Sequence, residues 1–175
     1  MVKVVLQPIG RVKSEVLLEL KGLIQDVGIE CEISEKSLKL PKEAYNRVRK
    51  QFNSSKLLSL LQSIFPRESG EEKIVGIVEE DIYAEGLNFV FGEAELSGKF
   101  AIVSLARLQD VNKNLFLERA LKEIIHEVGY TLGLEHCKNP LCVMHFSNCL
   151  ADTDRKNYRF CKSCSSRLWC DEKYF

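Results

Sequence analysis

Residues 124–137, IIHEVGYTLGLEHC, contain the side chains that could do chemistry. His126 and His136 offer imidazole nitrogens, which are common zinc ligands, and Glu127 directly follows the first of them. Catalytic zinc usually keeps three protein ligands and one open position for water. The metal lowers the pKa of that water to about 7, and a nearby carboxylate can accept its proton. In hydrolases with the pattern His-Glu-x-x-His-x-x-Gly-x-x-His the middle ligand is also a histidine, whereas this chain has Tyr130 there.

Tyr130 departs from this chemistry in two ways. Imidazole binds zinc in its neutral form, whereas a phenol must lose a proton whose ordinary pKa is about 10, although zinc can lower that value. The phenol oxygen also stands further from the backbone than an imidazole nitrogen. Tyr130 could therefore be an occasional ligand or an oxyanion donor, or it could be a packed tyrosine that binds no metal. The corresponding alternative for His126 is a surface histidine on a solvated helix face.

Four cysteines near the second histidine have the spacing of a metal site. Cys137 adjoins His136, and Cys142, Cys161 and Cys164 follow. The spacing is Cys-x4-Cys, then eighteen residues, then Cys-x2-Cys. This spacing is typical of a tetrahedral structural zinc site, and the alternative is that the four cysteines are unrelated buried thiols. Tight clustering of an odd number of cysteines favours metal ligation in a reducing compartment over disulfides.

The other three cysteines and Met144 say less about function. Cys149 and Cys170 could be spare ligands, although such residues are more often buried thiols, and Cys31 is expected in the core. Met144, taken by itself, is more often a core side chain than a functional one.

A long helix is expected to position the first histidine. From about Asn114 to Leu134 the apolar residues recur at helical spacing and form one stripe, namely Leu117, Leu121, Ile124, Ile125, Val128 and Leu132. His126 and Tyr130, four residues apart, share the opposite face, which we expect to border a cleft. Gly133 can end or bend the helix, and this bend would return His136 toward His126.

The first two-thirds of the chain alternates between strand-like and helical segments. Strand-like runs fall at residues 3–9, 29–34, 73–80, 87–94 and 99–108, and helical spacing falls at residues 14–28 and 54–65. Ser14 is the expected N-cap of the first helix, Gly28 its expected stop, and Pro66 ends the second helix. This order predicts a β-sheet covered by helices.

Length and composition bound the function. A chain of 175 residues fits one domain, 1–175, with an N-terminal part over 1–133 and a small zinc-bearing part over 134–175. Lys and Arg together number 25, as do Asp and Glu, so the chain has no overall bias toward nucleic acid or membranes. The start MVKVVLQPIG lacks the apolar stretch of a signal peptide, and no apolar run is long enough to span a membrane, so we expect a cytoplasmic protein.

With these residues in hand, the sequence resembles the archaemetzincins, a metzincin family of zinc metallopeptidases. The resemblance rests on HEVGYTLGLEHCKNPLCVM and CKSC, within residues 126–164. It implies an α/β (α+β) metzincin-like fold with a mixed β-sheet, covering helices, a long active-site helix and a small C-terminal subdomain. It also implies the following roles: His126 and His136 as ligands of a catalytic zinc, Glu127 as general base, Met144 as the Met-turn, and Cys137, Cys142, Cys161 and Cys164 around a structural zinc. A normal Met-turn would point His145 away from the metal.

Three functions remain open at this stage. The first is zinc-dependent hydrolysis of a peptide or protein substrate, impaired to some degree by Tyr130. The second is a pseudopeptidase that binds peptides or a partner and holds only the structural zinc. The third, a zinc-ribbon nucleic-acid binder, draws on the basic and aromatic residues 153–175 but conflicts with the neutral chain, so no nucleic-acid partner is expected. The natural substrate, the mode of cleavage and the oligomeric state do not follow from the sequence.

Overall fold

Two β-sheets and five α-helices make up the computed structural model, which describes residues 2–66 and 72–170, the last two without their side chains. The elements are β1 (Lys3–Pro8), α1 (Ser14–Asp26), β2 (Glu30–Ile33), β3 (Tyr45–Asn46), β4 (Gln51–Asn53), α2 (Ser54–Ile64), β5 (Glu72–Val78), β6 (Ile82–Tyr83), β7 (Gly92–Ala94), β8 (Phe100–Ser104), α3 (Lys113–Thr131), α4 (Leu150–Arg155) and α5 (Lys162–Cys170). Short 3-10 turns lie at Lys42–Ala44 and Ala106–Leu108.

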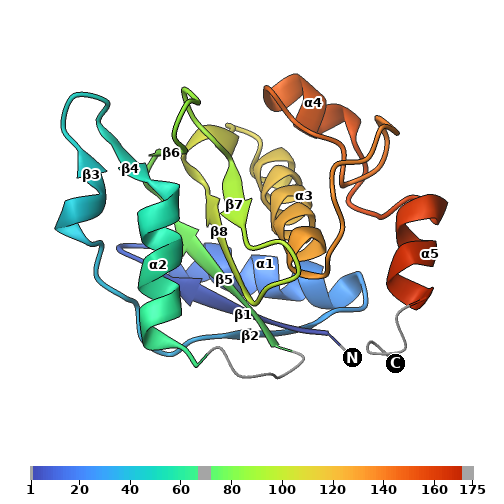
Figure 1. Ribbon diagram of the computed structural model, residues 1–175, viewed down its shortest axis with the longest axis horizontal. Helices are drawn as coiled ribbons and strands as arrows, with labels where there is room; N and C mark the ends of the chain where they lie inside the picture. Colours follow the sequence, from blue (N-terminus) through green and yellow to red (C-terminus); the bar gives the residue numbers. More distant parts are fainter. Residues whose placement is uncertain (1, 67–71, 171–175) are drawn as a thin grey trace.

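The larger sheet is mixed and has the strand order β2-β1-β5-β8-β7 (Figure 1). Its first four strands run parallel, and β7 pairs antiparallel with β8 at the edge of the sheet. The smaller sheet, in the order β3-β4-β6, lies beside it. The predicted mixed sheet with covering helices is therefore confirmed.

Side chains alternate between the two faces of the central strands, as the two-residue period of a strand requires. Val75, Ile77, Ala101 and Val103 join the core with α1 and α3. Ile74, Val78, Phe100 and Ile102 join a second core with α2. Because β5 and β8 bury both faces, they read as continuous apolar runs in the sequence.

Helix α3 has well-defined ends. The side chain of Asn112 accepts hydrogen bonds from the backbone N–H groups of Asn114 and Leu115 and so caps the first turn. At the other end Gly133 has a φ of 88°, and the next residue, Leu134, donates its N–H to the carbonyl of Gly129. This arrangement is a Schellman motif, which stops the helix at Thr131. Gly133 ends the helix as predicted, but the last helical residue is Thr131 and not Leu134.

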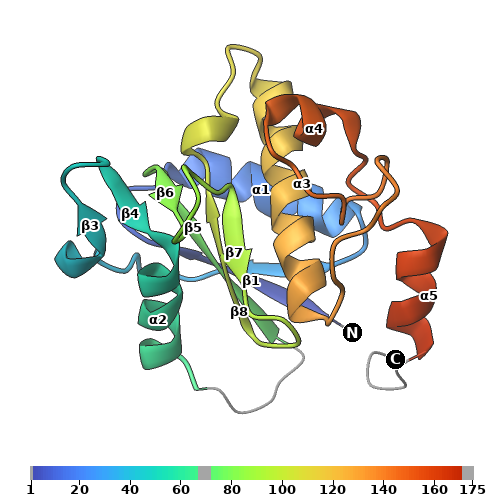
Figure 2. The same cartoon turned by 45° about the horizontal axis from the view of Figure 1, so that its top comes forward.

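The second half of α3 is buried on nearly every side. His126 and Glu127 are 5% and 4% exposed. In both views α3 lies between the larger sheet and the segment that carries α4 and α5 (Figures 1 and 2). The alternative of His126 as a solvated surface histidine is therefore wrong, because the C-terminal segment covers the face that the helical pattern left polar.

Several boundaries differ from the sequence analysis. Ser14 is the first helical residue and not the N-cap; Lys13 occupies that position and makes no side-chain capping bond. Residues 87–94 are a strand only from Gly92 onward, because Phe89 and Phe91 line a cleft and do not extend the sheet. The short strands β3, β4 and β6 and the helices α4 and α5 were not predicted. The division of the chain at residues 133 and 134 stays a prediction.

Within the described residues, no helix combines the length and the apolar character needed to cross a membrane.

Candidate active site and cysteine cluster

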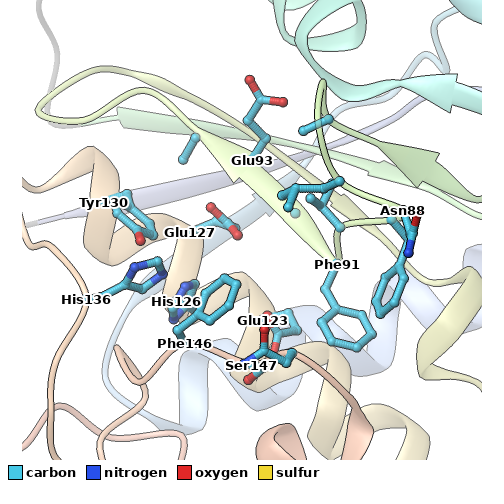
Figure 3. Close-up of a pocket in the computed structure, with 17 residues that line it drawn as sticks. Asn88, Phe91, Glu93, Glu123, His126, Glu127, Tyr130, His136, Phe146 and Ser147 are labelled. Atoms are coloured by element: carbon cyan, nitrogen blue, oxygen red, sulfur yellow. The ribbon is translucent and has the colours of Figure 1, made fainter.

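Three aromatic rings meet at the floor of a cleft beside β7. The ring centres of His126 and His136 are 5.6 Å apart, and Tyr130 lies 5.2 Å from the first and 5.3 Å from the second (Figure 3). Two imidazoles that share a tetrahedral zinc at ~2.1 Å per Zn–N bond have ring centres roughly 5 Å apart. The histidine pair therefore fits a zinc ion, and the bend at Gly133 returns His136 as the sequence suggested.

The ring of His126 is neutral and has an unprotonated Nε2. Its Nδ1 lies 2.7 Å from the carbonyl oxygen of Val143, which can only accept, so Nδ1 carries the proton and Nε2 keeps its lone pair. Burial lowers the pKa of His126 to about 4, so the ring is uncharged at neutral pH. Desolvation also lowers the pKa of His136, which is the more exposed of the two histidines.

Glu127 approaches the edge strand closely. A Cβ atom at Gly92 would lie 2.6 Å from Glu127 Oε1, so only glycine fits opposite this carboxylate. Burial raises the pKa of Glu127 well above its usual value, and the nearby charges of Glu123 and Glu93 add to that shift. The carboxyl group of Glu127 therefore lies against β7, near the ring of His126 in Figure 3.

Tyr130 stands where the pattern has its middle histidine, and it contacts both histidines edge-on, as a packed aromatic ring does. Its hydroxyl points toward the space between the labelled histidines and Glu127 in Figure 3. Burial, followed by the charge of Glu127, raises the pKa of Tyr130, which opposes formation of the phenolate that zinc would need. The site therefore presents a neutral phenol in place of a third nitrogen ligand.

Met144 packs against helix α3 at Gly129. It is fully buried, and a Cβ atom at Gly129 would come within 2.3 Å of its sulfur, so glycine lets the methionine reach the backbone of α3. The carbonyl of Met144 accepts a hydrogen bond from the N–H of Cys137. His145 Nδ1 contacts the carbonyl of Cys137 at 2.9 Å, and His145 is not among the residues that line the cleft.

The four predicted cysteines come together. The sulfur atoms of Cys137, Cys142, Cys161 and Cys164 all lie within 4.8 Å of one another. Cys137 Sγ is 3.7 Å from Cys161 Sγ, and Cys142 Sγ is 3.7 Å from Cys164 Sγ. With Zn–S bonds of 2.3 Å a tetrahedron has edges of about 3.8 Å, so this donor set fits a structural zinc.

Backbone N–H groups donate hydrogen bonds to two of the sulfurs, whereas burial raises the pKa of Cys142 and of Cys164. The N–H of Asn139 points to Cys137 Sγ at 3.4 Å, and the N–H of Cys161 points to Cys142 Sγ at 3.3 Å. A hydrogen bond from the backbone of Cys164 lowers the pKa of Cys161 to about 7. Hydrogen bonds of this kind to the ligand atoms are common in metal sites.

The other cysteines lie apart from this cluster where they are described. Cys31 is buried as expected, whereas Cys149 is exposed, so the expectation of a buried thiol is wrong there. The side chain of Cys170 lies outside the described part of the chain.

A buried ion pair behind the cleft was not predicted. Lys156 Nζ lies 3.0 Å from Glu123 Oε1, and the two side chains are 0% and 3% exposed. Thr153 Oγ1 donates to the same oxygen at 3.0 Å, so the pair joins α3 to the segment around α4. No sequence signal could have found it, because the partners are far apart in the chain and each residue type is ordinarily exposed.

The cleft itself has a volume of about 410 Å³, which is within the usual range for ligand sites. It is lined by Ala84, Leu87, Asn88, Phe89, Val90, Phe91, Gly92, Glu93, Ala94, Glu123, His126, Glu127, Tyr130, His136, Phe146, Ser147 and Asn148. The residues at the floor of this cleft were predicted from the sequence, whereas those of its walls were not. Glu93 was also missed; both hydroxyls at the start of α2, Ser54 and Ser55, donate to its carboxylate.

Known proteins are similar to this chain in both sequence and fold. Residues 1–169 match the model of Peptidase family M54. The protein is therefore a member of a zinc metallopeptidase family. The archaemetzincin of Methanocaldococcus jannaschii is 46% identical over 172 residues, covering 95% of this chain and 92% of that protein. The chain therefore belongs to the archaemetzincin family.

Solved structures agree with this assignment. The archaemetzincin of Methanopyrus kandleri superposes with a TM-score of 0.84 at 38% identity, covering 97% of this chain and 94% of that one. The archaemetzincin of Archaeoglobus fulgidus, crystallised in complex with malonate, gives a TM-score of 0.83 at 38% identity, covering 94% and 99% of the two chains.

Proposed function

We propose that the protein hydrolyses peptide bonds in this cleft, with His126 and His136 as the protein ligands of a catalytic zinc and Glu127 as general base. The observation that carries the proposal is the convergence of two neutral imidazoles and one carboxylate at the floor of a single cleft. Zinc bound there would polarise the scissile carbonyl and make water more acidic. The four-cysteine cluster would hold the structural zinc and fix the loop that delivers His136.

The chain supplies the remaining parts of the reaction. The outer edge of β7 is unpaired in the described sheet, so an extended peptide can add to it as a further strand. Glu127, held against Gly92, would accept a proton from water and pass it to the leaving amine. Tyr130 would stay neutral and donate its hydroxyl hydrogen to the oxyanion that forms at the scissile carbonyl.

Tyr130 also favours a second candidate, a pseudopeptidase that binds peptides without cleaving them. One of the three histidine ligands is missing, and even the loss of a group that only hydrogen-bonds to a ligand commonly costs about 10- to 100-fold in metal affinity or activity. Under this alternative the cleft would bind peptide, and only the four-cysteine site would hold zinc.

Substitution at Tyr130 separates the two candidates. In zinc-loaded protein assayed with a broad peptide library, Tyr130→His is expected to raise kcat/KM by roughly 10- to 100-fold, because it completes the three-histidine ligand set. Tyr130→Phe, which keeps the ring and removes the hydroxyl, is expected to lower kcat by about 10-fold or more. A wild-type protein that cleaves no peptide, beside a Tyr130→His variant that does, would establish the pseudopeptidase instead.

A further inference from the structure

Positive charge is concentrated in residues 35–56, which include β3 and β4 and which we call the basic segment. Seven of these residues are Lys or Arg and only two, Glu35 and Glu43, are acidic, although the 25 cations and 25 anions of the whole chain balance. All nine charged side chains are exposed. The cations are Lys36, Lys39, Lys42, Arg47, Arg49, Lys50 and Lys56.

The charges of the basic segment are not neutralised by the fold. Within the described part of the chain, none of the seven cations forms an ion pair with a carboxylate. Lys56 Nζ donates to the backbone carbonyl of Glu43 at 2.8 Å, and Arg49 Nε donates to the side-chain oxygen of Gln51 at 3.0 Å. A surface with this many unpaired cations attracts an anionic partner.

The turn of the β3–β4 hairpin is fixed against one end of the cleft. The guanidinium of Arg49 donates to the carbonyl of Leu87 at 2.6 Å and to that of Asn88 at 2.9 Å, and both of these residues line the cleft. Arg47 and Lys50 lie in the same turn, two residues and one residue from Arg49. Their exposed side chains are therefore close to the end of the cleft.

A peptide paired with the outer edge of β7 would extend toward this hairpin. β7 begins at Gly92, and residues 87–91, which precede it, all line the cleft. In both views β3 and β4 lie on the side of β7 opposite to α3 (Figures 1 and 2). Substrate residues that leave the cleft at this end therefore approach the basic segment.

The cleft and the basic segment have opposite charge. No Lys or Arg is among the described residues that line the cleft, whereas Glu93, Glu123 and Glu127 are. An acidic side chain is therefore disfavoured next to the scissile bond and favoured at the hairpin. This contrast would help to set the position of a substrate along β7.

We propose that the basic segment is a docking site for an acidic stretch of the substrate, a few residues away from the scissile bond on the side that leaves the cleft past Leu87 and Asn88. The inference rests on the proposed function, since it names a further part of the substrate of the same cleft. A peptide is favoured over a nucleic acid, because the carboxylates of the adjoining cleft repel phosphates.

The test uses peptides with one common cleaved sequence and a tail of four glutamates or four glutamines, attached at either end through a short linker. We would measure kcat and KM on the zinc-loaded protein and Kd on zinc-loaded Glu127→Gln. At one end the glutamate tail is expected to lower KM and Kd by about 5- to 10-fold, the effect of a few exposed charge pairs, and to leave kcat unchanged. The difference should vanish at about 1 M salt, where the Debye length is about 3 Å.

Arg47→Gln/Lys50→Gln should reduce the preference for the glutamate tail to less than about 2-fold and leave the values for the glutamine tail unchanged. The matched control is Lys21→Gln/Arg167→Gln, which removes two cations from α1 and α5 and should preserve the preference. Equal values for the two tails, or a preference that survives Arg47→Gln/Lys50→Gln, would overturn the inference. Salt-sensitive binding of a single-stranded oligonucleotide through Arg47 and Lys50, without a difference between the tails, would assign the segment to nucleic acid instead.

The proposed function can fail separately from this inference. A preference for the glutamate tail in Kd that depends on Arg47 and Lys50, without hydrolysis of any peptide, would keep the docking site and refute the enzyme. Hydrolysis with equal KM for both tails would keep the enzyme and refute the docking site.

Discussion

Replacement of Cys161 by serine is expected to remove one zinc per chain and to destabilise the protein severely. Structural zinc contributes roughly 10–16 kcal/mol of apparent binding free energy in small zinc domains, which exceeds the stability of many whole domains. Cys161 Sγ lies 3.7 Å from Cys137 Sγ, so loss of the thiolate opens the tetrahedron that holds the C-terminal segment. Zinc content and thermal unfolding of the purified variant measure both effects.

Cys149→Ser is the matched control, because Cys149 is an exposed cysteine outside the cluster. It should keep the zinc content and the melting temperature of the wild type. Peptide hydrolysis should also fall in Cys161→Ser, since the cluster fixes Cys137, which adjoins His136. A Cys161→Ser variant with unchanged zinc content and melting behaviour would refute the ligand assignment.

Replacement of Glu127 by glutamine is expected to lower kcat by about 10²- to 10⁴-fold, the usual contribution of a general base. Glutamine has nearly the same shape, so it fits against Gly92 and should leave folding and zinc content unchanged. The neighbouring carboxylates are poor substitutes, because Glu93 accepts hydrogen bonds from Ser55 and Glu123 pairs with Lys156.

Glu135→Gln provides the control for the Glu127 substitution. Glu135 is an exposed carboxylate one residue before His136, outside the lining of the cleft, and its loss should change kcat less than about 3-fold. Wild-type kcat in Glu127→Gln would mean that another group accepts the proton, and the proposed mechanism would then be wrong.

The predictable parts of the site are those whose residues lie close together in the sequence. Residues 126–142 hold both histidines and the first cysteine pair on α3 and the loop after it, and only two residues separate Cys161 from Cys164, so spacing predicted each of these groups. The end of the helix at Gly133 was also predictable, because a helix stop depends on local backbone angles. The four cysteines also had to be joined across eighteen residues, which the preference of zinc for four thiolates made reasonable.

The walls of the cleft were not predictable, since they depend on long-range packing. Phe89 and Phe91 alternate as strand residues do, yet their rings form the cleft wall, and periodicity does not distinguish the two. Lys156 looks like an ordinary surface lysine until α4 places it against Glu123.

The number of zinc atoms bound per chain tests the central claim most directly. The protein would be equilibrated with excess zinc, freed of unbound metal and measured by elemental analysis beside His126→Ala. We expect two zinc atoms in the wild type and one in the variant, which keeps only the four-cysteine site. A single zinc atom in the wild type would contradict a catalytic zinc at His126 and His136.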